Sequence, residues 1–282
     1  DYVGAKYACS ISSATNAIFL MFFNRRIIVD VPSIIPPVVL NALINGGNKI
    51  NFVDNIGWVG DSYVLHDFGH YKIIDSAQKV SKNQFKEEAN PQDLMFFSFY
   101  PTKPVGGIDG GMIVSDDYDK ILYFKESVLN GMSYAENNWE RKIKFPGWKM
   151  YMNSFQAYVA RENFKKLPAK LASLKKVRNF YNKELGYQNT SDHLYRITTA
   201  DNKDALLGMK NRGIICGIHY EAMHLNDVYK NHTKLGMLHA DYTKYNCPWS
   251  ETEAATTLSI PFNEKLKLSD LEHVVKSVRE VT

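Results

Sequence analysis

The chain has 282 residues, of which 45% are hydrophobic and 23% charged, proportions that are ordinary for a globular protein and leave ample length for a large core. Its 34 Lys and Arg residues against 30 Asp and Glu give a formal net charge of +4, spread along the chain, which gives no reason to expect a nucleic-acid-binding protein. No apolar run approaches the ~20 residues of a membrane span, and no signal-peptide pattern is visible. The three cysteines lie far apart with no C-x-x-C pair, so we expect a reducing, cytoplasmic environment and no zinc site.

Strand and helix patterns alternate along the first half of the chain. The predicted strands cover residues 6–10, 27–31, 50–53, 62–65, 72–74, 94–97 and 112–115, and the predicted helices cover residues 15–23, 38–44 and 116–128. Such alternation favours an α/β fold whose central sheet is mostly parallel and flanked by helices.

The strands predicted at 62–65 and 72–74 are separated by only six residues. Parallel neighbours need a crossover of about 10–12 residues or more, so either the two strands are not adjacent parallel strands or one of them is irregular. The same gap holds His66, Asp67 and His70, which could bind zinc, although a surface turn is the alternative interpretation.

The second half of the chain predicts a smaller α+β domain. Helices are expected at residues 153–164, 168–185, 203–212 and 269–281, and strands at 193–198 and 217–220. Pro168 suits the first turn of a helix. We therefore expect a large domain over residues 1–166 and a small domain over residues 167–282. For His219 and His224 we favour hydrogen bonds within the fold over a metal or acid–base role.

Residues 94–111 present a lone lysine at the end of a buried strand. The apolar run Leu94 to Phe97 ends abruptly in Ser98, Lys103 and a glycine-rich stretch. Burial among Phe97, Phe99 and Tyr100 would lower the pKa of the Lys103 ammonium group, because an apolar environment disfavours the charged form.

Polar groups at two other places would complete a binding site. Asp75 and Gln78 follow a predicted strand, and open α/β sheets bind ligands at the carboxyl ends of strands. The turn Ser12-Ser13-Ala14-Thr15 opens the first predicted helix, where hydroxyls and amides can bind a phosphate, although a plain N-cap is the alternative.

A lysine, an aspartate and a phosphate-sized polar turn are the parts of a pyridoxal phosphate site. This cofactor needs an amine to hold its aldehyde as a Schiff base and a carboxylate to keep its ring nitrogen protonated. Lys103 and Asp75 suit these roles, and Ser98 and the turn 12–15 suit the phosphate.

Several short motifs follow one another in a characteristic order: Ser-Ala-Thr before a helix, then Val-Pro, then Asp-Ser-Ala-Gln at 75–78, then Ser-Phe-x-x-x-Lys at 98–103 followed by Gly-Gly. Residues 213–220 and 258–262 continue the pattern. This order resembles the DegT/DnrJ/EryC1/StrS family of sugar aminotransferases over almost the whole chain.

The resemblance implies a three-layer transferase fold of type I with a smaller C-terminal α+β domain. It also implies transfer of an amino group from an amino acid, glutamate, to a nucleotide-linked keto sugar, with pyridoxal 5'-phosphate as cofactor. Lys103 would hold the cofactor and move protons, Asp75 would bind the ring nitrogen, and Gln78 would lie against the ring or its phenolic oxygen. The phosphate would be bound by Ser98, Ser13, Ala14 and Thr15.

Residues 130–149 resemble the family loop that reaches into a neighbouring subunit's site, which implies a homodimer with shared active sites. Lys149 stands where the family has an asparagine that binds the partner's cofactor phosphate, and a lysine can bind phosphate as a point charge. Pro36 replaces an aromatic residue that stacks on the cofactor ring, and Tyr100 and Tyr151 are further changes at ligand-facing positions.

Two alternatives to the aminotransferase stay open at this point. The usual N-terminal segment of the family is not seen before residue 1, so a non-catalytic relative that only binds cofactor or sugar nucleotide is one of them. A metal-dependent hydrolase that uses His66, Asp67 and His70 is the other. The sequence does not indicate which sugar, nucleotide or stereochemistry is involved.

Overall fold

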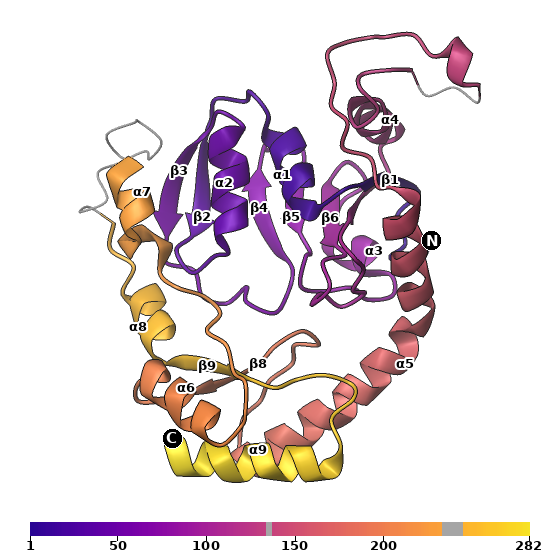
Figure 1. Cartoon of the computed structure of the whole chain (residues 1–282). Coiled ribbons are helices and arrows are strands. Elements are labelled where there is room, and N and C mark those ends of the chain that lie inside the picture. The colour runs from indigo at the N-terminus through magenta and orange to yellow at the C-terminus, as the bar shows by residue number, and fades with distance from the viewer. Residues whose placement is uncertain (134–136, 233–244) are drawn as a thin grey trace. The chain divides into compact units, whose positions relative to one another are not determined.

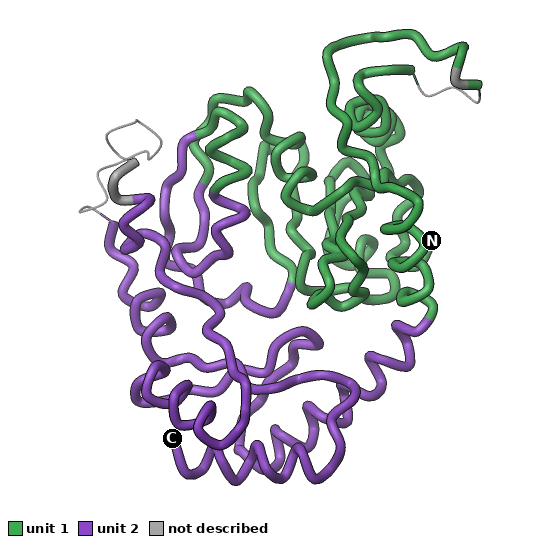
Figure 2. The backbone as a smooth tube through the Cα atoms, in the orientation of Figure 1, with its two compact units in different colours: residues 1–29, 41–48, 62–165 green, residues 30–40, 49–61, 166–282 purple. Residues whose placement is uncertain are grey.

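The computed structural model describes residues 1–133, 137–232 and 245–282 (Figure 1). Contacts divide the chain into two compact units, shown in Figure 2. Unit 1 holds residues 1–29, 41–48 and 62–165, and unit 2 holds residues 30–40, 49–61 and 166–282. The predicted domains, residues 1–166 and 167–282, stay a prediction, and the two units are described separately below.

Strands and helices alternate as predicted over residues 7–53, whereas three strands follow one another over residues 49–75 and two over residues 94–115. The strands are β1 (Tyr7–Ile11), β2 (Ile28–Pro32), β3 (Lys49–Val53), β4 (Tyr63–Asp67), β5 (Lys72–Asp75), β6 (Leu94–Ser98), β7 (Gly111–Ser115), β8 (Tyr195–Thr198) and β9 (Thr257–Ile260). The helices are α1 (Ala14–Phe22), α2 (Pro37–Asn45), α3 (Gln84–Glu88), α4 (Tyr118–Ser127), α5 (Ser154–Leu185), α6 (Asn202–Asn211), α7 (Asp227–His232), α8 (Pro248–Thr256) and α9 (Leu268–Val281), with 3₁₀ turns η1 (Asn138–Glu140) and η2 (Met223–Leu225).

The main sheet has five strands in the order β1-β7-β6-β5-β4, and β2 pairs with β3 in a separate sheet. Among the described residues of the main sheet only β5 and β6 run parallel, whereas β1–β7, β6–β7 and β4–β5 are antiparallel. The prediction of a mostly parallel sheet is therefore wrong, and the sheet is mixed. The reason is the connections: β6 reaches β7 through a loop, without the crossover helix that a parallel partner requires.

The short gap before β5 is resolved as an antiparallel pair. Phe68 donates its backbone N–H to the Tyr71 carbonyl at 2.9 Å, which reverses the chain between β4 and β5. The register pairs Tyr63 with Asp75 and shifts between Val64 and His66. The spacing left two options open, that the strands are not adjacent parallel strands or that one strand is irregular. Both hold, because β4 and β5 are adjacent but antiparallel and β4 is irregular.

Helices cover both faces of the main sheet in unit 1. Helix α1 packs on β1, β6 and β7, and every residue of β6 is buried. The first turns of α5 lie over the opposite face, where Ala157, Ala160 and Phe164 line an apolar cavity of about 440 Å³ together with Phe97 and Met112. The three layers predicted for this fold are thus present.

Helix α5 is one continuous helix of 32 residues, whereas two helices were predicted, at 153–164 and 168–185. The prediction used Pro168 as a start signal, but Pro168 lies inside the helix. Leu167, Leu174 and Tyr181 are buried at seven-residue spacing, so one apolar stripe runs through the proline and offsets the hydrogen bond that it removes.

Unit 2 has its own apolar core. The C-terminal half of α5 packs with β8, β9, α6 and α9 around buried side chains that include Val177, Tyr181, Tyr195, Leu258 and Val275. The strand predicted at 217–220 is not formed. Gly217 and Ser259 exchange a single pair of backbone hydrogen bonds, at 2.8 and 2.9 Å, as an isolated bridge.

The two histidines of this region are hydrogen-bonded within unit 2, as predicted. The His219 ring contacts Ser259 Oγ at 2.9 Å. The buried His224 lies 2.5 Å from Ser33 Oγ through Nδ1 and 3.2 Å from Glu251 Oε1 through Nε2.

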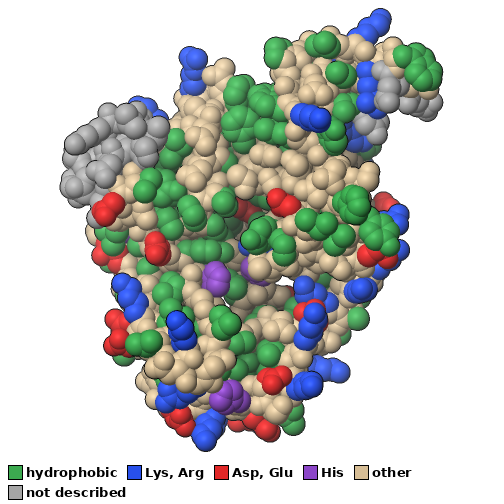
Figure 3. Space-filling view, viewed as in Figure 1, with side chains coloured by type: hydrophobic (Ala, Val, Ile, Leu, Met, Phe, Trp, Pro, Cys, Tyr) green, Lys and Arg blue, Asp and Glu red, His purple; other side chains and the backbone are tan. Residues whose placement is uncertain are grey.

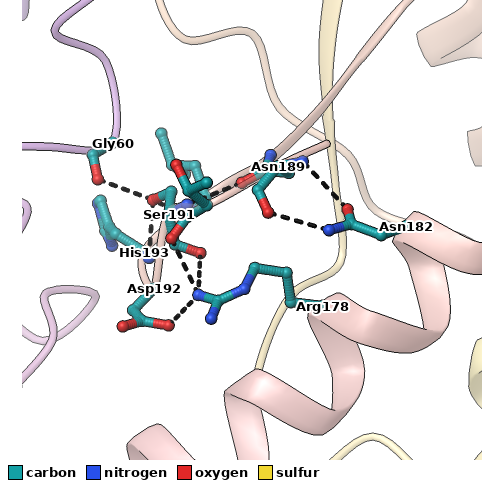
Figure 4. A network of polar contacts seen from close by, with 9 residues as sticks. Gly60, Arg178, Asn182, Asn189, Ser191, Asp192 and His193 are labelled. Atoms are coloured by element: carbon teal, nitrogen blue, oxygen red, sulfur yellow. Dashed lines mark hydrogen bonds and ion pairs between the residues drawn. The ribbon is translucent and has the colours of Figure 1, made fainter. Parts of the chain in front are cut away.

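A polar network fixes the loop between α5 and β8 in unit 2 (Figure 4). Arg178 donates to the carbonyls of Thr190 and Ser191 and pairs with Asp192. Ser191 Oγ donates to the Gly60 carbonyl at 2.8 Å. These contacts all join residues of unit 2, so a structural role explains the network.

The charged side chains are mixed on the surface. On the face drawn in Figure 3, acidic and basic side chains lie interspersed, in line with the even spread of charge along the chain. Within the described residues, helices with enough length and apolar character to span a bilayer are absent.

Candidate active site

The parallel strands β5 and β6 end side by side, at Asp75 and Ser98. Asp75 pairs in register with Phe96, and the Ser76 N–H donates to the Phe96 carbonyl at 2.9 Å. Because the carboxyl ends of parallel strands share one edge of the sheet, Asp75 and Ser98 are presented on the same edge. The sequence predicted this edge as the ligand site.

The Asp75 carboxylate is buried, with 5% of the residue exposed. Its Oδ1 accepts the Ala77 N–H at 2.9 Å, and its Oδ2 accepts the Tyr63 hydroxyl at 3.3 Å. Burial raises the pKa of Asp75 to about 6, although the two hydrogen bonds and the charge of Lys103 act in the opposite direction. The carboxylate therefore remains mostly ionised at neutral pH.

Lys103 lies in the loop between β6 and β7, where its backbone N–H donates to the Tyr100 carbonyl at 2.9 Å. Burial lowers the pKa of Lys103, and the Asp75 charge partly restores it. A lowered ammonium pKa makes the neutral, nucleophilic amine more accessible, as the sequence predicted. The two side chains are close enough for their charges to interact, so the structure brings the predicted carboxylate and amine together.

The loop that carries Lys103 is held from three directions. Phe99 donates to the Gly110 carbonyl at 2.9 Å and accepts from Gly107 at 2.7 Å. Asn163 of α5 donates its Nδ2 to the Gly106 carbonyl at 2.6 Å. Gly106 has φ +66° and a Cβ there would lie 2.9 Å from the Pro101 carbonyl oxygen, so the turn requires glycine.

Helix α1 begins beside the same edge. Ser13 is its N-cap and accepts the Asn16 N–H at 3.2 Å, so the N-cap alternative for this hydroxyl is correct. The N–H groups of Ala14 and Thr15 belong to the first turn, whose amides have no acceptor within the helix. They are the groups in this turn that suit an anion.

Gly111 joins the α1 turn to Ser98. Gly111 pairs with Ser98 across β6 and β7, and a Cβ at Gly111 would lie 3.0 Å from the Ala14 nitrogen and 2.9 Å from the Phe97 carbonyl oxygen. Ser98, Gly111 and the start of α1 therefore form one surface. Ser98 Oγ accepts the Tyr100 N–H at 3.3 Å.

Replacing Gly111 by alanine is expected to lower the free energy of unfolding by about 1–3 kcal/mol, since backbone atoms on both sides must move. Urea denaturation measures the loss, and phosphate-ester binding should weaken in parallel because the Ala14 amide is displaced. Gly57→Ala is the control, since a Cβ at Gly57 meets nothing closer than Asn55 Oδ1 at 3.9 Å. Equal effects of the two changes would contradict this account.

The remaining predicted residues lie around the site or outside unit 1. Gln78 is buried in the turn after β5. Lys149 is exposed and forms an isolated β-bridge with Leu129. The carbonyl of the next residue, Met150, accepts the Ser12 N–H at 2.7 Å, so the backbone beside Lys149 is connected to the α1 turn. Tyr100 and Tyr151 are exposed, and Pro36 belongs to unit 2.

The suggested zinc cluster finds no support. His66 packs against Phe68 and Phe22, His70 packs against Tyr71, and Asp67 accepts the Gly69 N–H at 2.7 Å. Within the described parts of the chain, groups of three or more His, Cys, Asp or Glu side chains suited to a metal are absent.

Sequence reasoning missed two residues that contact the site. Tyr63 donates to Asp75, and the six-residue gap was the signal that could have revealed it, since a short gap favours an antiparallel return. Asn163 holds the lysine loop from a position 57 residues away, and no local pattern indicates such a contact.

A buried carboxylate, a lysine on a glycine-rich loop and a helix N-terminus at one edge of an α/β sheet are the parts of a transaminase site. The sequence matches the model of the DegT/DnrJ/EryC1/StrS aminotransferase family over residues 67–279, and the chain belongs to this family. The resemblance seen in the order of its motifs is confirmed.

A curated relative and two solved structures are similar to this chain. The chain is 24% identical to a Campylobacter jejuni UDP-4-amino-4,6-dideoxy-N-acetyl-beta-L-altrosamine transaminase, covering 97% of this chain and 85% of the relative. Helicobacter pylori PseC, an aminotransferase involved in the biosynthesis of pseudoaminic acid, superposes with a TM-score of 0.77 at 17% identity, covering 99% and 87%. Spr1654 from Streptococcus pneumoniae, solved in a PLP-form, gives a TM-score of 0.77 at 17% identity, covering 99% and 88%. The predicted α/β transferase fold is confirmed, apart from the direction of its strands.

Proposed function

We propose that this protein is a pyridoxal-phosphate-dependent aminotransferase that moves an amino group from glutamate to a nucleotide-linked keto sugar. The observation that carries the proposal is the buried Asp75 carboxylate at the end of β5, whose charge acts on the Lys103 amine, at the edge of the sheet where α1 begins. The substrate class is supported by the Campylobacter jejuni relative, a UDP-4-amino-4,6-dideoxy-N-acetyl-beta-L-altrosamine transaminase.

The residues present fit this cofactor. Its ring nitrogen requires an ionised carboxylate, its aldehyde an amine with a lowered pKa and its phosphate a set of hydrogen-bond donors, and Asp75, Lys103 and the first amides of α1 supply these groups. When bound, pyridoxal phosphate supplies an aldehyde that carries the amino group and a ring that accepts electrons.

Each residue then has a distinct task. Lys103 Nζ would hold the cofactor and would then take and return the proton that is moved during transfer, a role that its lowered pKa favours. Asp75 would keep a proton on the ring nitrogen because its carboxylate is charged and buried. Ser98 and the amides of Ala14 and Thr15 would bind the phosphate, and Gln78 would lie against the ring.

The proposal extends to the assembly and its location. A homodimer is supported by the segment 130–149, in which Trp139 is 84% and Ile143 76% exposed, since large exposed apolar side chains are typical of contact surfaces. Lys149 would then bind the partner's cofactor phosphate. A cytoplasmic location is supported by Cys9, Cys216 and Cys247, which are free thiols.

The test is a visible absorption spectrum of the protein with added pyridoxal phosphate, before and after borohydride reduction, with mass mapping of the modified residue. We expect one covalent adduct, on Lys103, and a spectral change when glutamate is added to the unreduced protein. A spectrum without any bound cofactor would contradict the proposal and favour a non-catalytic relative. Turnover is then assayed with UDP-linked keto sugars and glutamate.

A further inference from the structure

Tyr63 lies directly across from Asp75 on the neighbouring strand. The two residues are register partners in the antiparallel pair of β4 and β5, so their side chains leave the sheet on the same face. The Tyr63 hydroxyl donates to Asp75 Oδ2 at 3.3 Å. The contact follows from the register of the antiparallel pair.

We propose that Tyr63 is a positioning residue for the cofactor site, whose phenol holds the Asp75 carboxylate ionised and in one orientation. The inference rests on the proposed function, because Asp75 matters to catalysis only if it binds the ring nitrogen of pyridoxal phosphate.

The surroundings of Asp75 explain why a second donor matters. The carboxylate is buried, which favours its neutral form, and a neutral carboxyl cannot keep a proton on a ring nitrogen. Three groups oppose this: the Ala77 N–H, the Tyr63 hydroxyl and the charge of Lys103. Of these, the Lys103 amine would itself hold the cofactor, and the Ala77 amide donates to Oδ1. Tyr63 is the side chain whose hydroxyl donates to Oδ2.

The direction of the pH effect follows from the hydrogen bond. A phenol that donates to a carboxylate stabilises the ionised form, so its removal raises the pKa of Asp75 above the value of about 6 in the intact protein. Among the described residues, the titratable groups that act on the pKa of Asp75 are Lys103 and Tyr63. As pH is lowered, the affinity for the cofactor should therefore begin to fall at a higher pH in a variant without the hydroxyl than in the wild type.

The experiment measures the dissociation constant of pyridoxal phosphate between pH 5 and pH 9 for the wild type and Tyr63→Phe. Around pH 9 the two should agree, because Asp75 is ionised in both. At pH 5 to 6 the variant should bind about five- to tenfold more weakly, with its midpoint about one pH unit higher. Tyr187→Phe is the matched control, since it removes a tyrosine hydroxyl in unit 2 that is hydrogen-bonded to the Thr198 carbonyl.

Two results would overturn the proposal. One is an unchanged midpoint in Tyr63→Phe. The other is the same loss of affinity at every pH, which would indicate a general packing role. Circular dichroism and thermal unfolding of each variant confirm that it is folded.

A separate measurement keeps this inference distinct from the proposed function. The infrared carbonyl band of the protonated Asp75 carboxyl, assigned by its loss in Asp75→Asn, is titrated in the protein without cofactor. If the wild type binds no pyridoxal phosphate, the proposed function fails, but the band still reports on Tyr63. An infrared midpoint that does not rise in Tyr63→Phe would refute the hydrogen-bonding role itself.

Discussion

Lys103→Ala is expected to abolish the borohydride-stable adduct and to lower the transamination rate by at least about 10²–10⁴-fold, the contribution of a positioned acid–base group. The reason is that, in the proposed function, the same amine both holds the cofactor and moves the proton. Single-turnover kinetics with glutamate, followed through the cofactor's absorbance, measure the loss.

The exposed Lys82 offers a control, since Lys82→Ala removes a surface amine of the same unit and should leave the rate unchanged. Added methylamine should restore part of the rate of Lys103→Ala by supplying a free base. Retention of full activity, or of a covalent adduct at another lysine, would show that Lys103 is not the catalytic amine.

Without cofactor, the Asp75→Asn variant should become more stable relative to the wild type as pH rises. The same variant should bind pyridoxal phosphate poorly. The folded-state pKa of Asp75 is about 6, above the ordinary value of 3.8, so folding favours the protonated form. The contribution of this side chain to stability is therefore present below pH 3.8 and is lost as pH rises through 6. Between pH 4.5 and pH 8 the wild type should lose about 2 kcal/mol relative to the variant.

Urea denaturation of both proteins across this range, without cofactor, checks the expectation. Asp54→Asn is the matched control. Burial raises the pKa of Asp54, but hydrogen bonds from Ser250 and Trp249 lower it by more, so the pKa lies below the ordinary value of 3.8. Its contribution is lost only at lower pH, so its difference from the wild type should stay flat. A flat difference for Asp75→Asn as well would mean that the carboxyl is not destabilised by burial.

The chemical groups of the site could be predicted from sequence because each depends on a short segment. Lys103 follows a buried run and precedes glycines, Asp75 ends a strand, and the α1 turn carries a Ser N-cap. Strand ends and caps are determined locally, by apolar spacing and by side chains that hydrogen-bond to neighbouring amides.

The contacts between segments could not be predicted in the same way. The direction of β1 and β7 depends on which strand each one meets, and the Asn163 contact with Gly106 depends on where α5 crosses the sheet. Pro168 misled because a proline at a helix start and one inside a helix look alike in sequence. Residues 217–220 have strand composition, but of these four residues Gly217 is the one that forms a β-bridge, with Ser259.

Helix α5 has a mechanical consequence that follows from Pro168. The helix belongs to both units, and the division between them falls between residues 165 and 166. Proline has no N–H to donate to the carbonyl of residue 164, so one rung of the helical ladder is missing within a few residues of that division. Bending of α5 should therefore require the least free energy at residues 164–168. Asn163, which donates a hydrogen bond to the loop that carries Lys103, directly precedes these residues.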